Sequence, residues 1–160
     1  MMKKILVSLF LLLTVTLVNA QDKKQYYNED LNGMEQIDQA IAQAKSEGKN
    51  VLCQVGGNWC PWCIRFADYI GADEEIKKIV DDNFVYIHVN YSKKNRNHEA
   101  MKRLGNCTRF GFPVLVVLND EGNVVHIQDS GLLEEGEGYS KKKVQSFFTH
   151  WTPKAIRGEK

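Results

Sequence analysis

Two of the four cysteines in the chain, Cys60 and Cys63, stand three residues apart in the sequence Trp-Cys-Pro-Trp-Cys. This C-x-x-C spacing allows two thiols to form a disulfide, to exchange with another disulfide or to bind a soft metal ion. A structural zinc site is poorly supported, because the sequence has no second C-x-x-C pair and no H-x-x-H pair. A c-type haem is excluded, because Ile64 follows where haem attachment needs a histidine.

The N-terminal residues indicate where these thiols work. Two lysines precede a largely apolar stretch over residues 5–18, and the small Ala20 follows. This pattern is typical of a secretory signal peptide. We therefore expect a signal peptide over residues 1–20, cleavage after Ala20, and a periplasmic or otherwise exported mature protein. The apolar core is shorter than the ~20 residues of a membrane span, so the alternative of an uncleaved anchor is weaker, and no membrane span is expected after it.

Length and composition indicate one soluble domain. The chain has 160 residues, of which 43% are hydrophobic and 26% are charged, as in ordinary folded proteins and unlike disordered or collagen-like chains. Its net charge of +1 lacks the basic excess of a nucleic-acid-binding protein, so no nucleic-acid partner is expected. We expect a domain over residues 31–152, a polar and mobile segment over 21–30 before it, and a tail over 153–160 after it.

Hydrophobic spacing and turn residues predict alternating helices and strands. The first helix has a capping box at residues 32–35 and ends at Gly48, and the last helix is expected to end at Pro153. Between these two helices, further helices are expected over residues 61–70, 74–80 and 97–104, and strands over 51–55, 84–89, 113–118 and 124–128. This order predicts an α/β sandwich with a mixed sheet of about four strands flanked by helices.

Two motifs resemble the thioredoxin superfamily when they are placed on these elements. Trp-Cys-Pro-Trp-Cys falls between a strand and a helix, and Phe-Gly-Phe-Pro at residues 110–113 opens a strand-turn-strand hairpin. The likeness covers residues 30–152. Within the superfamily, the sequence most resembles small exported bacterial proteins related to the C-terminal domain of the disulfide reductase DsbD. The resemblance implies a thioredoxin-like fold and a thiol–disulfide oxidoreductase, acting as a reductase on client proteins with disulfides. It also implies a membrane electron-transfer partner and no cofactor beyond the redox-active disulfide.

The position of the cysteine pair at a helix start suits this chemistry. Pro61 fits the first turn of a helix, where its missing N–H is not needed. Unpaired backbone N–H groups and the helix dipole at that end favour a thiolate at Cys60. We expect Cys60 to be the exposed nucleophile and Cys63 to be the resolving thiol, reacting through a mixed disulfide. A plain structural disulfide and two buried thiols are the alternatives.

Four further residues are candidates for client binding. Trp59 and Trp62 are expected to cover the disulfide and to offer an apolar surface, with ordinary packing as the alternative for Trp62. The resemblance places Phe112 and Pro113 at the cis peptide that faces the C-x-x-C pair, where the backbone of Phe112 can pair with a client strand. From the residues alone, a trans proline that begins an edge strand is an equal alternative.

One departure from thioredoxin concerns proton transfer. Thioredoxin usually has a buried acid at the position of Gln54, and glutamine cannot accept a proton. His88, on the neighbouring predicted strand, has an ordinary pKa near ~6.5 and is a possible proton acceptor for Cys63, with a packed structural histidine as the alternative. Cys53 is expected to be a buried free thiol and Cys107 to lie at a helix end or in a loop. A disulfide between these two cysteines remains an alternative.

Two other functions remain compatible with the sequence. Thiolates suit copper(I), so the cysteine pair could handle copper, although no loop rich in Met or His lies near it. The apolar residues around the pair could also form a binding module that holds client proteins without any exchange.

Overall fold

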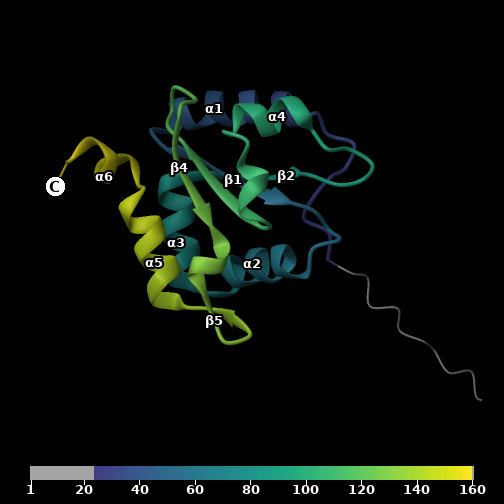
Figure 1. The fold of residues 1–160 in the computed structure, drawn as a ribbon. Helices are drawn as coiled ribbons and strands as arrows, with labels where there is room; N and C mark the ends of the chain where they lie inside the picture. The colour runs from purple at the N-terminus through teal and green to yellow at the C-terminus, as the bar shows by residue number, and fades with distance from the viewer. Residues whose placement is uncertain (1–23, 160) are drawn as a thin grey trace, which may run out of the picture.

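A four-stranded sheet lies between two layers of helices in the computed structural model, which describes residues 24–159 (Figure 1). The fold class expected from the sequence is confirmed. The predicted signal peptide and its cleavage after Ala20 lie outside the described residues. The elements, in chain order, are α1 (Gly33–Glu47), β1 (Asn50–Gly56), α2 (Pro61–Ala72), α3 (Glu74–Asn83), β2 (Phe84–Asn90), α4 (His98–Arg103), the 3₁₀ helix η1 (Cys107–Phe110), β3 (Val114–Leu118), β4 (Val124–Asp129), the 3₁₀ helix η2 (Ser130–Leu133), β5 (Glu134–Glu135), β6 (Gly138–Tyr139), α5 (Lys141–His150) and α6 (Pro153–Arg157).

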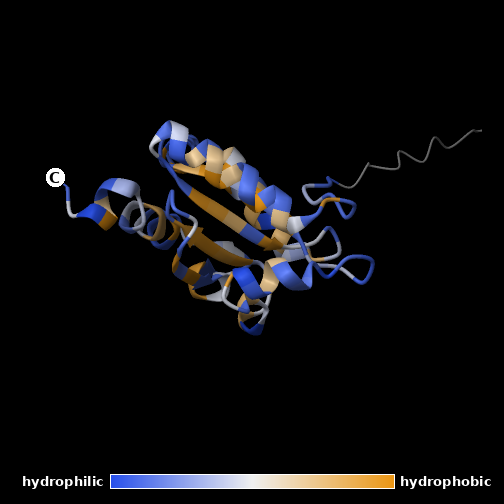
Figure 2. Ribbon diagram, turned by 90° about the horizontal axis from the view of Figure 1, so that it is seen from above, coloured by the Kyte–Doolittle hydropathy of each residue, from blue (hydrophilic) through white to orange (hydrophobic). Residues whose placement is uncertain are grey.

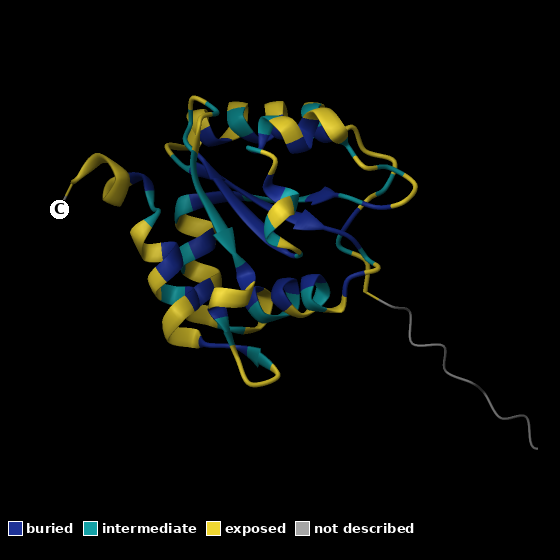
Figure 3. Ribbon diagram, viewed as in Figure 1, coloured by how far each residue is buried: buried dark blue, intermediate teal, exposed yellow. Residues whose placement is uncertain are grey.

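The sheet is mixed, with the strand order β2-β1-β3-β4. Strand β2 is parallel to β1, whereas β3 is antiparallel to both β1 and β4. The two central strands, β1 and β3, are buried along their whole length, and Figure 3 shows them in dark blue between partly exposed helices. A strand covered on both faces needs an almost continuous apolar run, which is what these two strands have.

Successive residues of β1 point to opposite faces of the sheet and supply two separate apolar layers. Val51, Cys53 and Val55 pack toward α1 and α4, whereas Leu52 packs with Phe66 of α2 and with residues of α3 and α5. Figure 2 shows the hydrophobic strands between helices that carry polar residues on their outer sides. This arrangement fixes α2, which carries the cysteine pair, against the central strands.

Local capping signals explain where the first helix begins and ends. The Asn32 side chain accepts hydrogen bonds from the N–H groups of Met34 and Glu35, and Gly48 ends α1 with a φ of 66°. Both features confirm the sequence prediction, because Asn is a favoured N-cap residue and Gly adopts a positive φ without strain.

The C-terminal region differs from the prediction. Helix α5 ends at His150, and Pro153 begins the short helix α6 within residues 153–160, where a tail was expected. Thr152 caps α6 by accepting a hydrogen bond from the N–H of Ala155, and proline is well tolerated at the first helical position. The loop expected before α5 also contains the two-residue strands β5 and β6.

Residues 24–30, which we call the N-terminal strap, pack onto the domain rather than extending away from it. Asn58 holds the strap: its Oδ1 accepts from the N–H groups of Tyr26 (3.0 Å) and Tyr27 (3.1 Å), and its Nδ2 donates to the carbonyl of Tyr27 (2.7 Å). Only 3% of Tyr27 is exposed. The overall polar composition of this segment therefore did not reveal that Tyr27 is buried and Tyr26 partly buried against the domain. Within the described part of the chain, no helix has the length and apolar character needed to cross a membrane.

Candidate active site

Cys60 and Cys63 form a disulfide at the N-terminus of α2, with their Cα atoms 5.2 Å apart. Cys60 is the N-cap residue of α2, and its Sγ accepts a hydrogen bond from the N–H of Cys63 at 3.2 Å. This donor and the helix dipole both stabilise negative charge on the Cys60 sulfur after reduction. Cys60 is 5% exposed and Cys63 is fully buried, so Cys60 is the more accessible sulfur but less exposed than expected.

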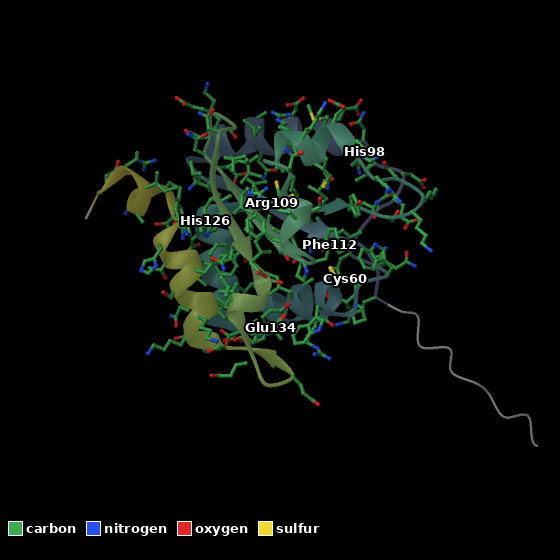
Figure 4. All side chains as sticks on the ribbon, viewed as in Figure 1. Cys60, His98, Arg109, Phe112, His126 and Glu134 are labelled. Carbon is green, nitrogen blue, oxygen red and sulfur yellow. A yellow bond between two sulfur atoms is a disulfide. The ribbon has the colours of Figure 1, made fainter. Side chains whose placement is uncertain are left out.

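Aromatic side chains cover the disulfide and explain its low exposure. Phe112 packs against the pair and lies beside Cys60 in Figure 4. The Trp59 ring meets Phe112 edge-on, with 5.4 Å between ring centroids, and its Nε1 donates to the carbonyl of Tyr91 at 2.7 Å. Trp59 itself is 54% exposed, so part of its apolar ring faces solvent beside Phe112.

Trp62 takes part both in the covering of the disulfide and in ordinary packing. Its ring packs on the cysteine pair and also on the apolar layer below α2. The Trp62 ring meets the Tyr139 ring edge-on, with 5.5 Å between the two ring centroids. The guanidinium of Arg65 lies 4.5 Å from the centroid of the Trp62 ring. These contacts favour the packing interpretation for Trp62, whereas more than half of Trp59 is exposed.

The Phe112–Pro113 peptide bond is cis, as the resemblance implied. Val114, the next residue, pairs in the sheet with Val55 near the carboxyl end of β1. Since β1 leads directly into the segment that carries Cys60, this register brings Phe112 and Pro113 to the same end of the sheet as the disulfide. The two motifs that are far apart in the sequence therefore form one site.

Below the disulfide, the fully buried Gln54 is the centre of a polar network. Its Nε2 donates to the Tyr27 hydroxyl oxygen at 2.6 Å and to the Cys63 carbonyl at 2.9 Å, while its Oε1 accepts from the hydroxyl of Tyr86. The glutamine that replaces an acid is thus a fully hydrogen-bonded amide that supports the first turn of α2.

His88 lies beside Gln54 in the parallel register of β1 and β2, within a box of three tyrosines. Its ring centroid is 5.3 Å from that of Tyr26, 5.2 Å from that of Tyr27 and 4.6 Å from that of Tyr86. Its buried Nε2 has no hydrogen-bond partner among residues 24–159. Burial lowers the pKa of His88 to about 4, well below the value assumed from the sequence. A role in proton transfer stays a prediction.

Sequence reasoning missed the two tyrosines of the strap. Tyr27 packs directly on Cys60 and Cys63, while the Tyr26 hydroxyl donates to Asp68 of α2 at 2.5 Å. The signal that could have indicated them is an adjacent pair of aromatic residues in an otherwise polar segment. Such a pair needs an apolar surface to cover, and here that surface is the active-site end of α2.

The other two cysteines are separate from this site. Cys53 and Cys107 are both free and fully buried, which confirms the expectation for Cys53 and shows no disulfide between them. Burial raises the pKa of both thiols, that of Cys107 to about 11. Across residues 24–159, no group of three or more His, Cys, Asp or Glu side chains is placed to hold a metal ion.

A groove of about 550 Å³ adjoins the exposed face of Trp59. Its lining residues combine aromatic walls with a mainly basic rim: Glu29, Trp59, Tyr91, Ser92, Lys93, Lys94 and Arg96. The site therefore has an apolar surface beside the sulfur pair and positive charge next to that surface.

Comparison with known proteins supports the interpretation of this geometry. A model of the thioredoxin-like family matches residues 32–120. The disulfide bond reductase DsbH of Chlamydia pneumoniae is 28% identical over 90 residues, which cover 52% of this chain and 54% of DsbH. The thiol:disulfide interchange protein DsbD of Yersinia enterocolitica is also 28% identical over 90 residues, which cover 56% of this chain but 15% of DsbD. The chain thus spans about half the length of DsbH and a small part of DsbD.

Solved structures agree on the fold. A disulphide isomerase from Xylella fastidiosa Temecula1 superposes with a TM-score of 0.69 at 24% identity, covering 79% of this chain and 95% of that one. A structure of DsbH oxidoreductase gives a TM-score of 0.52 at 21% identity, covering 70% of this chain and 78% of that one. With the family model matching more than half of the sequence, the chain belongs to the thioredoxin-like family.

Proposed function

We propose that the protein is an exported thiol–disulfide oxidoreductase that reduces disulfides in client proteins. The observation that carries this proposal is the Cys60–Cys63 disulfide at the N-terminus of α2, with the Cys60 sulfur capping the helix. A helix N-terminus stabilises a thiolate, and the thiolate is the reactive form in disulfide exchange.

The reaction is a two-electron transfer in two exchange steps. The Cys60 thiolate of the reduced protein attacks one sulfur of a client disulfide, and the other client sulfur leaves as a thiolate that takes up a proton. Cys63 then loses its proton to solvent and attacks the Cys60 sulfur. The bond between Cys60 and the client breaks, the second client thiolate leaves and is protonated, and the Cys60–Cys63 disulfide forms. The client gains two electrons and the protein loses two.

The surface around the pair is suited to an unfolded or extended client segment. Trp59 and Phe112 offer apolar area next to Cys60, and the backbone of Phe112 lies at the end of β3 where a client strand can add by hydrogen bonding. The groove beside Trp59 extends this surface.

The reducing direction and the compartment rest on two supports. The two curated relatives are named a disulfide bond reductase and a thiol:disulfide interchange protein. The sequence of residues 1–20 has the pattern of an export signal. Continued turnover as a reductase outside the cytoplasm needs electrons, so we infer a membrane protein as the electron donor and no further cofactor.

The test combines insulin reduction with redox equilibration in glutathione and dithiothreitol buffers. We expect Cys60→Ser to abolish turnover, Cys63→Ser to accumulate mixed disulfides, and the control Cys53→Ala to keep wild-type turnover. A potential near thioredoxin's ~−270 mV supports a reductase, and one near ~−120 mV indicates an oxidase.

Two outcomes contradict oxidoreductase function. Full biological activity in Cys60→Ser would favour a client-binding module. Tight copper(I) binding by the reduced pair, without any insulin turnover, would favour copper handling.

A further inference from the structure

Tyr27 and Cys63 meet across Gly56, at the point where β1 ends. A Cβ atom at Gly56 would overlap the Cys63 Sγ and lie 3.1 Å from the Tyr27 hydroxyl oxygen. The absence of a side chain at Gly56 therefore lets the hydroxyl and the resolving sulfur approach the same point. Tyr27 and Cys63 are 3% and 0% exposed, so the space beside Gly56 is shielded from water.

The hydrogen bonds of Gln54 determine which way the Tyr27 proton is directed. The Gln54 Oε1 accepts from Tyr86, which fixes the orientation of the amide. Both hydrogens of its Nε2 are then used, one for the Tyr27 oxygen and one for the Cys63 carbonyl. Tyr27 is thus an acceptor toward Gln54 and keeps its own O–H for another partner. Among residues 24–159, no hydrogen bond donated by this O–H is found.

We propose that Tyr27 donates a hydrogen bond to the Cys63 sulfur when the disulfide is open, and that this bond promotes the resolving step. The proposal rests on the proposed exchange reaction and assigns a residue from outside the C-x-x-C motif to it. A donor to a thiolate stabilises the charged form, so it increases the thiolate fraction of Cys63 near neutral pH.

Tyr27 keeps its proton throughout the reaction. Burial raises its pKa, so the hydroxyl remains a donor over the working pH range. The other titratable groups around it are His88, Tyr86, Tyr26 and Tyr139, together with the partner sulfur of Cys60. None of the four ring groups carries a charge near neutral pH, because burial lowers the pKa of His88 and raises the pKa of each tyrosine. The Tyr27 hydroxyl is therefore the neighbouring group that stabilises negative charge on the Cys63 sulfur, by donating a hydrogen bond to it.

The step that Tyr27 assists can be isolated with Ellman's disulfide as the client. Cys60 attacks it and releases one thionitrobenzoate, which leaves a mixed disulfide on Cys60. Cys63 gives its proton to solvent and attacks the Cys60 sulfur, which releases the second thionitrobenzoate and forms the Cys60–Cys63 disulfide. The second phase of colour release reports the resolving step alone.

The variant Tyr27→Phe removes the hydroxyl and keeps the ring. Loss of a hydrogen bond to a charged group should raise the pKa of Cys63 by about one unit, which lowers its thiolate fraction about tenfold near pH 7. A more basic thiolate is about threefold more reactive, so the second phase should be about threefold slower near pH 7 and about threefold faster well above the pKa. Carbon-13 NMR of labelled cysteine in Cys60→Ser gives the pKa of Cys63 directly.

A matched control separates this effect from structural loosening. Tyr26→Phe removes the neighbouring hydroxyl of the same strap, which binds Asp68, and should leave the second phase unchanged.

The outcomes distinguish this inference from the proposed function. If the wild-type protein releases no second thionitrobenzoate, the proposed exchange reaction itself fails. If wild-type exchange is normal but Tyr27→Phe leaves the pKa of Cys63 unchanged, the role of Tyr27 is overturned. Slowing at every pH, or an equal effect of Tyr26→Phe, would show that Tyr27 acts only through the packing of the strap, which also overturns it.

Discussion

At the scale of single residues, this site is built from neutral polar groups at the position where thioredoxin usually has a buried acid. Gln54 cannot take a proton, and it is held by two tyrosine hydroxyls and the Cys63 carbonyl. His88 is beside it with a buried Nε2 that has no partner among the described residues. Proton exchange at Cys63 therefore depends on hydrogen-bond donors and solvent rather than on a buried carboxylate.

The buried His88 predicts a specific dependence of stability on pH. Its pKa is about 4 in the folded protein, against ~6.5 when unfolded, so the unfolded state binds more protons between these values. Stability is fully present above the unfolded pKa, and we expect up to about 3 kcal/mol to be lost as the pH falls to the folded pKa. Urea denaturation of wild-type protein and His88→Phe at several pH values should show this loss in the wild type alone. An equal loss in both would mean that His88 is charged in the native protein.

At the scale of elements, each helix that frames the site begins at a residue with a defined local role. Cys60 caps α2 with its sulfur, Pro61 occupies the first helical turn, and Asn32 caps α1 on the opposite face of β1. The reactive sulfur is thus also the N-cap of α2, and negative charge on it is stabilised by the backbone N–H of Cys63.

Removing the cap of α1 should lower stability without changing the chemistry. Asn32→Ala loses the hydrogen bonds from the N–H groups of Met34 and Glu35, which should lower the free energy of unfolding by about 1 kcal/mol. The matched control is Gln39→Ala, on the exposed face of the same helix, for which we expect a change within about 0.5 kcal/mol. Thermal or urea denaturation measures both, and insulin reduction should be unchanged in both. A large loss of turnover in Asn32→Ala would mean that α1 has a direct role at the site.

At the scale of the whole molecule, the fold divides the four cysteines into two classes. Cys60 and Cys63 lie at the start of α2, beyond the carboxyl end of β1 and under aromatic side chains, whereas Cys53 and Cys107 are inside the layer beneath α1. Because burial raises the pKa of the second pair, these thiols stay protonated and shielded while the domain is folded.

Alkylation should reveal these two classes directly. We expect iodoacetamide to label no cysteine in the native oxidised protein, to label Cys60 first after mild reduction, and to label Cys53 and Cys107 only in denaturant. Mass spectrometry of the labelled protein counts the modified residues. Rapid labelling of Cys53 under native conditions would show that the α1 layer opens readily and would contradict the packing described here.

The sequence alone was sufficient for several features that depend on neighbours along the chain, although the short helix α6 was not predicted. The helix caps at Asn32 and Gly48, the C-x-x-C pair at a helix start, and the alternation of helices and strands all follow from local patterns. The resemblance carried by two motifs added the cis bond before Pro113. Secretion by way of residues 1–20 remains a prediction from the same kind of local pattern.

Three features became known only from the tertiary structure. Tyr27 packs on Cys63, Cys107 is fully buried, and Gln54 is the centre of a hydrogen-bonded network. The physical reason is sequence distance. Tyr27 and Gln54 are 27 residues apart, and the side chains of both reach the active site only because β1 and the strap converge at Gly56. Local pattern predicts which segments form helices and strands, whereas contacts between distant segments depend on how those elements pack together.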